Sequence, residues 1–215
     1  MTDGREDNPS DLKLKTGKHK RCSHFTGKII THSAELERRA SDMADQNVRF
    51  RTWVKHRSGM TDREIDRIVG ETAEEVEAAV DCTTCGQCCR YLRIILDQED
   101  ITRLSKRLKM SKSHFLRLYA ESLSPDRKGI GKEDICFSVS PCPFLEENCC
   151  TIYEDRPKSC RDFPYLHAEN FRGRMLLLVE YSFLCPIVFH TFEALKKKLP
   201  WKNGKSETKR TNPGA

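Results

Sequence analysis

The amino-acid sequence predicts an α+β fold, mainly helical with small β-hairpins, arranged around a cluster of cysteines. Apolar residues recur at steps of three and four over residues 33–80, which is typical of amphipathic helices. Short apolar runs bounded by turn residues follow in the second half of the chain and favour hairpins. The third observation is the cysteine content, eleven in 215 residues, well above that of an ordinary cytosolic protein.

Two helices are expected in the first part of this pattern. The first is about five or six turns long and ends at Arg57-Ser58-Gly59. Its predicted buried face consists of Leu36, Ala40, Met43, Asn47, Phe50 and Val54. Thr61 and Glu64 form a capping box for the second helix. The buried face of that helix is expected to contain Ile65, Ile68, Thr72, Val76, Ala79 and Val80. We expect the two helices to pack as a hairpin and the second to lead into Cys82.

The middle of the chain is predicted to alternate between strand and helix. Residues 91–96 form a strand, and Asp97 caps a helix whose apolar residues are Ile101, Leu104 and Leu108. Ser111 caps a shorter helix with Phe115, Leu118 and Tyr119. Residues 122–133 are expected to be a loop. Gly129-Ile130-Gly131-Lys132 within it lacks the glycine spacing of a phosphate loop, so no nucleotide-binding motif is predicted.

The last elements follow from turn residues and a proline. Residues 142–153 are expected to form a tight hairpin around Glu146-Glu147-Asn148, and residues 155–160 a short helix that carries Cys160. A second hairpin is predicted from residues 165–171 and 175–183, which flank Arg172-Gly173-Arg174. Cys185-Pro186 then opens a final helix, residues 187–199, with Phe189, Phe192 and Leu195 facing inward.

These elements divide the chain into four parts, as expected for one domain with tails. Residues 1–32 are predicted to be a disordered tail and residues 33–80 a helical hairpin. Residues 81–199 form the cysteine-cluster domain, in which we expect metal to be bound. Residues 200–215 are a basic disordered tail.

Charge and hydropathy exclude several classes of function. The net charge is +6, but residues 196–215 alone hold seven basic and one acidic side chain, so the body does not favour nucleic acid. No apolar run approaches the roughly 20 residues of a membrane span. Neither a secretory signal at the amino terminus nor a twin-arginine signal at Arg38-Arg39 is recognised, so we expect a cytoplasmic protein. Whether the chain binds a protein partner is left open.

The cysteines allow two interpretations. A disulfide framework is disfavoured because the number is odd and a reducing cytosol keeps thiols reduced. Metal binding is favoured because thiolates are soft donors that select zinc or iron–sulfur clusters. In the amino-terminal tail, a zinc site of His19, Cys22, His24 and His32 is disfavoured, since it offers only one thiolate on a polar segment.

The spacing of the cysteines sharpens the metal hypothesis. Cys82-x-x-Cys85-Gly86-x-Cys88-Cys89 places several thiols on a turning backbone, and Gly86 permits the turn. The predicted metal ligands are Cys82, Cys85, Cys88, Cys89, Cys142, Cys150, Cys160 and Cys185. Eight thiolates serve two four-ligand sites, or one site with reserve thiols, so zinc and a four-iron (4Fe–4S) cluster both stay open. Adjacent Cys88 and Cys89 favour a multinuclear or cluster site, since neighbouring side chains on an extended backbone point to opposite sides and would otherwise serve different centres. Arg90, Arg156 and Arg161 are candidates to offset the negative charge.

The same residues resemble a known family. The order Cys82-x-x-Cys85-Gly86-x-Cys88-Cys89, then Cys142-Pro143-Phe144-Leu145, then Cys150-Thr151-Ile152-Tyr153-Glu154-x-Arg156-Pro157-x-x-Cys160-Arg161-x-Phe163-Pro164, then Cys185-Pro186 resembles the CxxCxxCC, or YkgJ-like, family of zinc- or iron-chelating proteins. The resemblance covers about residues 80–190 and implies that the eight predicted ligands are the family's cysteines. Cys22, Cys136 and Cys149 lie outside the pattern and are expected to be spare thiols.

Three functions are consistent with this resemblance. The leading hypothesis is a metal-binding module that ligates an iron–sulfur cluster or zinc. The family's relative among flagellin lysine N-methylases implies a second hypothesis, an iron–sulfur-dependent methylase, although no adenosylmethionine loop is recognised here. The third is a structural zinc scaffold for protein interaction, in which every zinc site is coordinatively closed. Whether the chain is an enzyme is left open.

Overall fold

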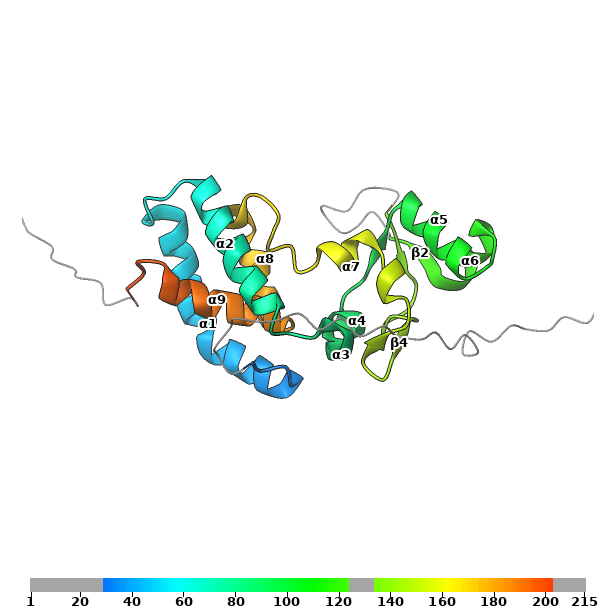
Figure 1. Cartoon of the computed structure of the whole chain (residues 1–215), viewed down its shortest axis with the longest axis horizontal. Coiled ribbons are helices and arrows are strands. Elements are labelled where there is room, and N and C mark those ends of the chain that lie inside the picture. The colour runs from blue at the N-terminus through cyan, green and yellow to red at the C-terminus, as the bar shows by residue number, and fades with distance from the viewer. Residues whose placement is uncertain (1–28, 124–133, 203–215) are drawn as a thin grey trace, which may run out of the picture. The chain divides into compact units, whose positions relative to one another are not determined.

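The computed structural model describes residues 29–123 and 134–202, and it confirms a mainly helical α+β fold (Figure 1). The described residues fall into two compact units. Residues 81–123 and 134–163 form one of them, here called the cysteine unit. Residues 29–80 and 164–202 form the other, here called the helical unit. The chain divides between these units after residue 80 and again after residue 163, so residues 164–199 group with the helices rather than with residues 81–163.

The helical unit is built from four helices. They are α1 (Ser33–His56), α2 (Asp62–Glu77), α8 (Phe171–Tyr181) and α9 (Pro186–Lys198). The expected helices are confirmed for α1, α2 and α9, including the capping box of Thr61 and Glu64 at the start of α2. However, α1 and α2 pack mainly against α8 and α9, not as a hairpin against each other. Phe192 of α9 contacts aromatic rings of two other helices. Its ring centroid lies 6.3 Å from that of Phe50 in α1 and 6.0 Å from that of Phe171 in α8.

The hairpin predicted around Arg172-Gly173-Arg174 is wrong, because this segment begins α8. Asn170 caps the helix, since its side-chain oxygen accepts a hydrogen bond from the backbone N–H of Gly173 at 3.0 Å. Asp66 of α2 accepts bonds from the N–H groups of Asn170 and Phe171, both at 2.9 Å. The buried side chains of α8 recur at helical spacing: Phe171, Met175, Leu178 and Val179. In the sequence, the uninterrupted apolar run from Leu176 to Val179 obscures this helical spacing.

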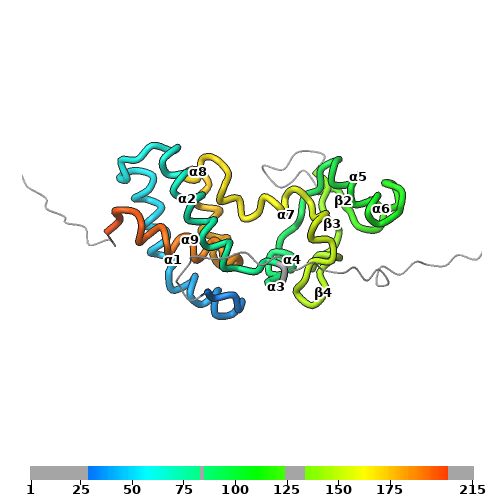
Figure 2. The backbone as a smooth tube through the Cα atoms, viewed as in Figure 1, coloured from blue at the N-terminus to red at the C-terminus, as the bar shows by residue number. Residues whose placement is uncertain are grey.

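The cysteine unit contains short elements on a small core. Its helices are α3 (Cys82–Cys85), α4 (Gln87–Tyr91), α5 (Gln98–Arg107), α6 (Lys112–Tyr119), η2 (Tyr153–Asp155) and α7 (Lys158–Asp162). Its strands are β1 (Ile95–Leu96), β2 (Ala120–Ser122), β3 (Ile135–Phe137), β4 (Leu145–Glu146) and β5 (Cys149–Cys150). The chain path is followed most easily in the tube view of Figure 2.

An antiparallel sheet in the order β1-β3-β2 supports the core of this unit. Ile95, Cys136 and Glu121 lie opposite one another across its three strands. The expected caps at Asp97 and Ser111 and the β4–β5 hairpin are confirmed. The strand expected at residues 91–96 is shorter, because α4 continues through Tyr91. The expected loop with its glycine-rich turn lies largely outside the described residues.

The ends of the described chain pack more closely than expected of tails. The backbone N–H of Ile30 donates a hydrogen bond to Nε2 of His190 at 2.8 Å. The Trp201 ring lies edge-on to Phe50 with centroids 5.2 Å apart. Both contacts are within the helical unit. No helix in the described ranges is long and apolar enough to cross a membrane.

Candidate metal centre

A sharp turn between two short helices presents the first group of cysteines. Gly86 joins α3 to α4 with φ +65°, a conformation that favours glycine. A Cβ atom at this position would also approach the Asn148 backbone to within 3.0 Å. Glycine is therefore required both by the turn and by the close approach of the β4–β5 hairpin. The turn brings the cysteines of α3 and α4 against the later group, Cys142, Cys150 and Cys160.

Cys88 and Cys89 point toward the same region. Their Sγ atoms are 4.0 Å apart. The expectation of an extended backbone, with the two side chains on opposite sides, is wrong because both residues belong to α4. On a helix, adjacent side chains diverge by only about 100°, so two neighbouring thiols can face one centre.

Six of the eight predicted ligands come together around Cys88. A negative charge on the Cys88 sulfur would raise the pKa of each of the surrounding thiols, which shows that they lie within electrostatic reach of it. These thiols are Cys85, Cys89, Cys142, Cys150 and Cys160. Three of them, Cys142, Cys150 and Cys160, also pack against the apolar core of the unit.

Hydrogen bonds to the backbone carbonyls of α4 hold the second half of the set against the first group of cysteines. The N–H of Cys142 donates to the carbonyl of Cys89 at 2.7 Å, and the Ser140 hydroxyl donates to the carbonyl of Arg90 at 2.8 Å. Cys150 lies opposite Leu145 in the β4–β5 ladder. Cys160 lies on α7. The site therefore joins three segments of the cysteine unit that are distant in the sequence.

Burial and mutual repulsion control the protonation of these thiols. Burial raises the pKa of Cys142 to about 12, and it also raises the pKa of Cys85, Cys150 and Cys160. A hydrogen bond from Cys89 lowers the pKa of Cys88 to about 7, with help from the charge of Arg156. The same bond, together with burial, raises the pKa of Cys89. Cys88 is thus the thiol most ready to become a thiolate, and the raised pKa of the others favours their protonated form until a cation displaces the proton.

Arg156 is placed to offset negative charge at the centre. Its positive charge lowers the pKa of Cys88 and Cys150. The guanidinium lies 3.9 Å from the centre of the Tyr153 ring and donates to the Tyr153 carbonyl at 2.8 Å. The other two candidates make hydrogen bonds to other groups: Arg90 to the Asn148 side chain and Arg161 to the Arg156 carbonyl.

The remaining cysteines have different surroundings. Cys82 begins α3 and is exposed, and Cys149 precedes Cys150 in β5. Cys136 is fully covered in β3, with Arg93 and Glu121 groups 4.0 and 3.9 Å from its sulfur. Cys185 caps α9 in the helical unit, so its predicted role as a ligand stays a prediction. His19, Cys22 and His24 lie outside the described residues.

The donor set fits a thiophilic metal in its chemistry. Among the residues that the structure describes, no three His, Cys, Asp or Glu side chains are arranged as a ready ligand set around one point. The gathered donors are nevertheless all thiols, and soft thiolates select zinc or iron–sulfur clusters. All ten described cysteines are free of disulfide bonds. A bound metal would therefore require these thiols to rearrange.

A small unit of short helices and hairpins around clustered thiols defines the class of cysteine-rich metal-binding domains. Residues 81–176 match the model of the CxxCxxCC family, described as "Putative zinc- or iron-chelating domain". This match confirms the resemblance seen in the cysteine spacing. The match ends before Cys185. No curated protein and no solved structure matches the chain.

Proposed function

We propose that the cysteine unit is a metal-binding module that ligates an iron–sulfur cluster. The observation that carries this proposal is the gathering of five thiols around a sixth, that of Cys88, within one compact unit. A tetrahedral zinc ion and a four-iron cluster each take four thiolate ligands, so six thiols are enough for either and leave two in reserve. The neighbouring sulfurs of Cys88 and Cys89, 4.0 Å apart, suit a centre with more than one metal ion.

The chain's own residues would prepare this site in three ways. Gly86 turns the backbone so that α3 and α4 present thiols together. The apolar packing of Cys142, Cys150 and Cys160 keeps water away from the sulfurs. Arg156 reduces the electrostatic cost of several thiolates in one place. When bound, an iron–sulfur cluster supplies one-electron chemistry and cross-links the segments that hold it.

Metal analysis on protein purified without oxygen tests the proposal. We expect iron and acid-labile sulfide, with the brown charge-transfer absorbance of a cluster. Cys136→Ser is the matched control, since Cys136 belongs to the same unit but lies in the sheet. Colourless protein with stoichiometric zinc and no sulfide would overturn the cluster and support the structural zinc scaffold, which uses the same thiols.

The two predicted ligands outside the group of six need separate measurements. Cys82 is exposed at the start of α3, and Cys185 belongs to the helical unit. If both are ligands, Cys82→Ser and Cys185→Ser lower the metal content as strongly as Cys85→Ser. If the group of six is sufficient, the first two variants keep the metal content of the unmodified protein.

A further inference from the structure

Helix α7 carries Cys160 but is too short to hold itself in place. It spans five residues, Lys158–Asp162, and Pro157 at its N-cap contributes no side-chain hydrogen bond. Isolated helices of this length are unstable in water because one turn costs more conformational entropy than its hydrogen bonds return. The orientation of the Cys160 thiol must therefore depend on contacts made by other elements.

Asp100 of α5 provides the first such contact. Its side chain is buried, at 1% exposed, and both of its carboxylate oxygens accept from the backbone N–H of Lys158, at 3.0 and 3.2 Å. Lys158 is the first residue of α7, so the carboxylate caps that helix as well as its own. Negative charge is favourable at this end of a helix. The aspartate also accepts a hydrogen bond from Arg103.

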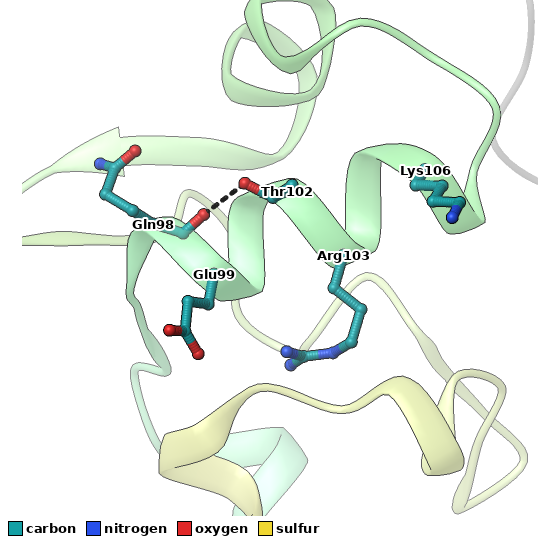
Figure 3. Close-up of a pocket in the computed structure, with 5 residues that line it drawn as sticks. All are labelled: Gln98, Glu99, Thr102, Arg103 and Lys106. Atoms are coloured by element: carbon teal, nitrogen blue, oxygen red, sulfur yellow. Dashed lines mark hydrogen bonds between the residues drawn. The ribbon is translucent and has the colours of Figure 1, made fainter.

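Arg103 provides the second contact, one turn further along α5. Its Nε donates to the carbonyl of Asp155 at 3.3 Å, and a terminal nitrogen donates to the carbonyl of Arg156 at 3.1 Å. Arg103 also lines a shallow pocket on α5, and Figure 3 shows its guanidinium reaching away from the helix toward a neighbouring segment. One planar group thus spans two successive carbonyls before α7.

Strand β1 closes the arrangement from another side. The Ser159 hydroxyl donates to the carbonyl of Ile95 at 2.8 Å. The segment that leads to Cys160 is therefore held by side chains and backbone of α5 and β1, elements of the sheet-supported core. None of these contacts uses a cysteine.

We propose that Asp100 and Arg103 are positioning residues of the metal centre, which hold residues 155–158 so that Cys160 faces Cys88. This inference rests on the proposed metal binding by the cysteine unit. It assigns a task to the ion pair between buried Asp100 and half-buried Arg103, which is not needed for capping α5 alone, since Arg103 bonds outside its own helix. Partners that orient metal ligands typically change metal affinity by about 10- to 100-fold when altered.

Arg103→Lys is the decisive variant, and Arg107→Lys is its matched control. Both residues lie on α5 and both reach Asp155, but Arg107 pairs with the Asp155 carboxylate at 3.1 Å and not with the backbone. Each full-length variant is loaded with Zn²⁺ as the probe and treated with an alkylating reagent. Mass spectrometry then gives the alkylation rate of every cysteine separately.

We expect Arg103→Lys to weaken Zn²⁺ binding by about 10- to 100-fold and to raise the alkylation rate of Cys160 by about tenfold, while Cys85 and Cys88 stay protected. Arg107→Lys is expected to leave all rates unchanged. Asp100→Asn, which keeps the side-chain shape and loses the charge, should reproduce the selective exposure of Cys160 and serves if Arg103→Lys does not fold.

Three results would contradict this inference or its basis, and they are distinguishable. Equal alkylation of all cysteines in Arg103→Lys indicates a general loss of stability and overturns a positioning role. Identical behaviour of Arg103→Lys and Arg107→Lys overturns it as well. If Zn²⁺ protects no cysteine in the unmodified protein and the protein purified without oxygen contains neither iron nor zinc, the proposed metal binding itself fails.

Discussion

Cys88 is the residue whose negative charge would raise the pKa of all five of the other gathered thiols. We predict that Cys88→Ser removes most of the bound metal and lowers the melting temperature. Without this thiolate the metal binds less tightly, and its binding then contributes less to the free energy of folding. Cys136→Ser is expected to keep its metal, since the Cys136 sulfur contacts Arg93 and Glu121 in the sheet. Metal content and thermal melting of both variants check this. Equal loss in the two variants would contradict the assignment of Cys136 as a spare thiol.

His190 predicts a pH dependence of stability in the helical unit. Burial lowers the pKa of His190, although Glu193 opposes the shift, and Nε2 accepts the hydrogen bond from Ile30 only when it carries no proton. The unfolded chain therefore takes up this proton at a higher pH than the folded one. Stability is fully present above about pH 6.5 and falls as the pH is lowered further.

Denaturant unfolding at several values between about pH 5 and pH 8 measures this effect. His190→Gln is expected to reduce the loss of stability at low pH, because its side chain does not titrate. His56→Gln, at an exposed histidine of α1, is the matched control and should leave the pH profile unchanged. A profile that is the same in all three proteins would exclude His190 as its source.

At the scale of elements, the end of the chain separates into a packed and a charged part. Deleting residues 203–215 should leave metal content and melting unchanged and reduce only the salt-sensitive association with polyanions, which depends on basic residues. Deleting residues 200–215 also removes Trp201 and its edge contact with Phe50. We expect this longer deletion to cost about 2 kcal/mol of unfolding free energy, roughly half that of a fully buried aromatic ring.

Thermal and denaturant unfolding of the two deletions provide the measurement. The shorter deletion is the control for the loss of charge, since both lack the same basic residues beyond Lys202. Similar stability of the two proteins would show that the Trp201 contact contributes little, as expected if the tail began at residue 200.

At the scale of the whole molecule, each unit has its own apolar core. Phe192→Ala in the helical unit is expected to lower the unfolding free energy by about 3–5 kcal/mol and to leave the metal content of the folded protein unchanged. Phe115→Ala removes an equally buried ring from the cysteine unit and is expected to lower both stability and metal content. Denaturation and metal analysis of the two variants check this. Metal loss in Phe192→Ala would show that the helical unit takes part in the site.

Local signals in the sequence were sufficient for much of the structure. The capping box at Thr61 and Glu64, the cap at Asp97 and the β4–β5 turn each depend on residues a few positions apart, so the chain alone predicts them. The continuous apolar run of α8 hid its helical period, and its start depends on Asp66, a residue of another helix. That prediction failed because the deciding contact is not local.

By itself, the sequence determined a mainly helical α+β chain with a CxxCxxCC cysteine pattern and soft, thiol-only donors, because residue type and short spacing settle donor chemistry and local caps. Only the tertiary structure decided that Cys88 is surrounded by five other thiols, that Cys185 belongs to the helical unit, and that α5 holds the α7 turn. These features join segments distant in the chain. Their partners are chosen by packing, which no local spacing specifies.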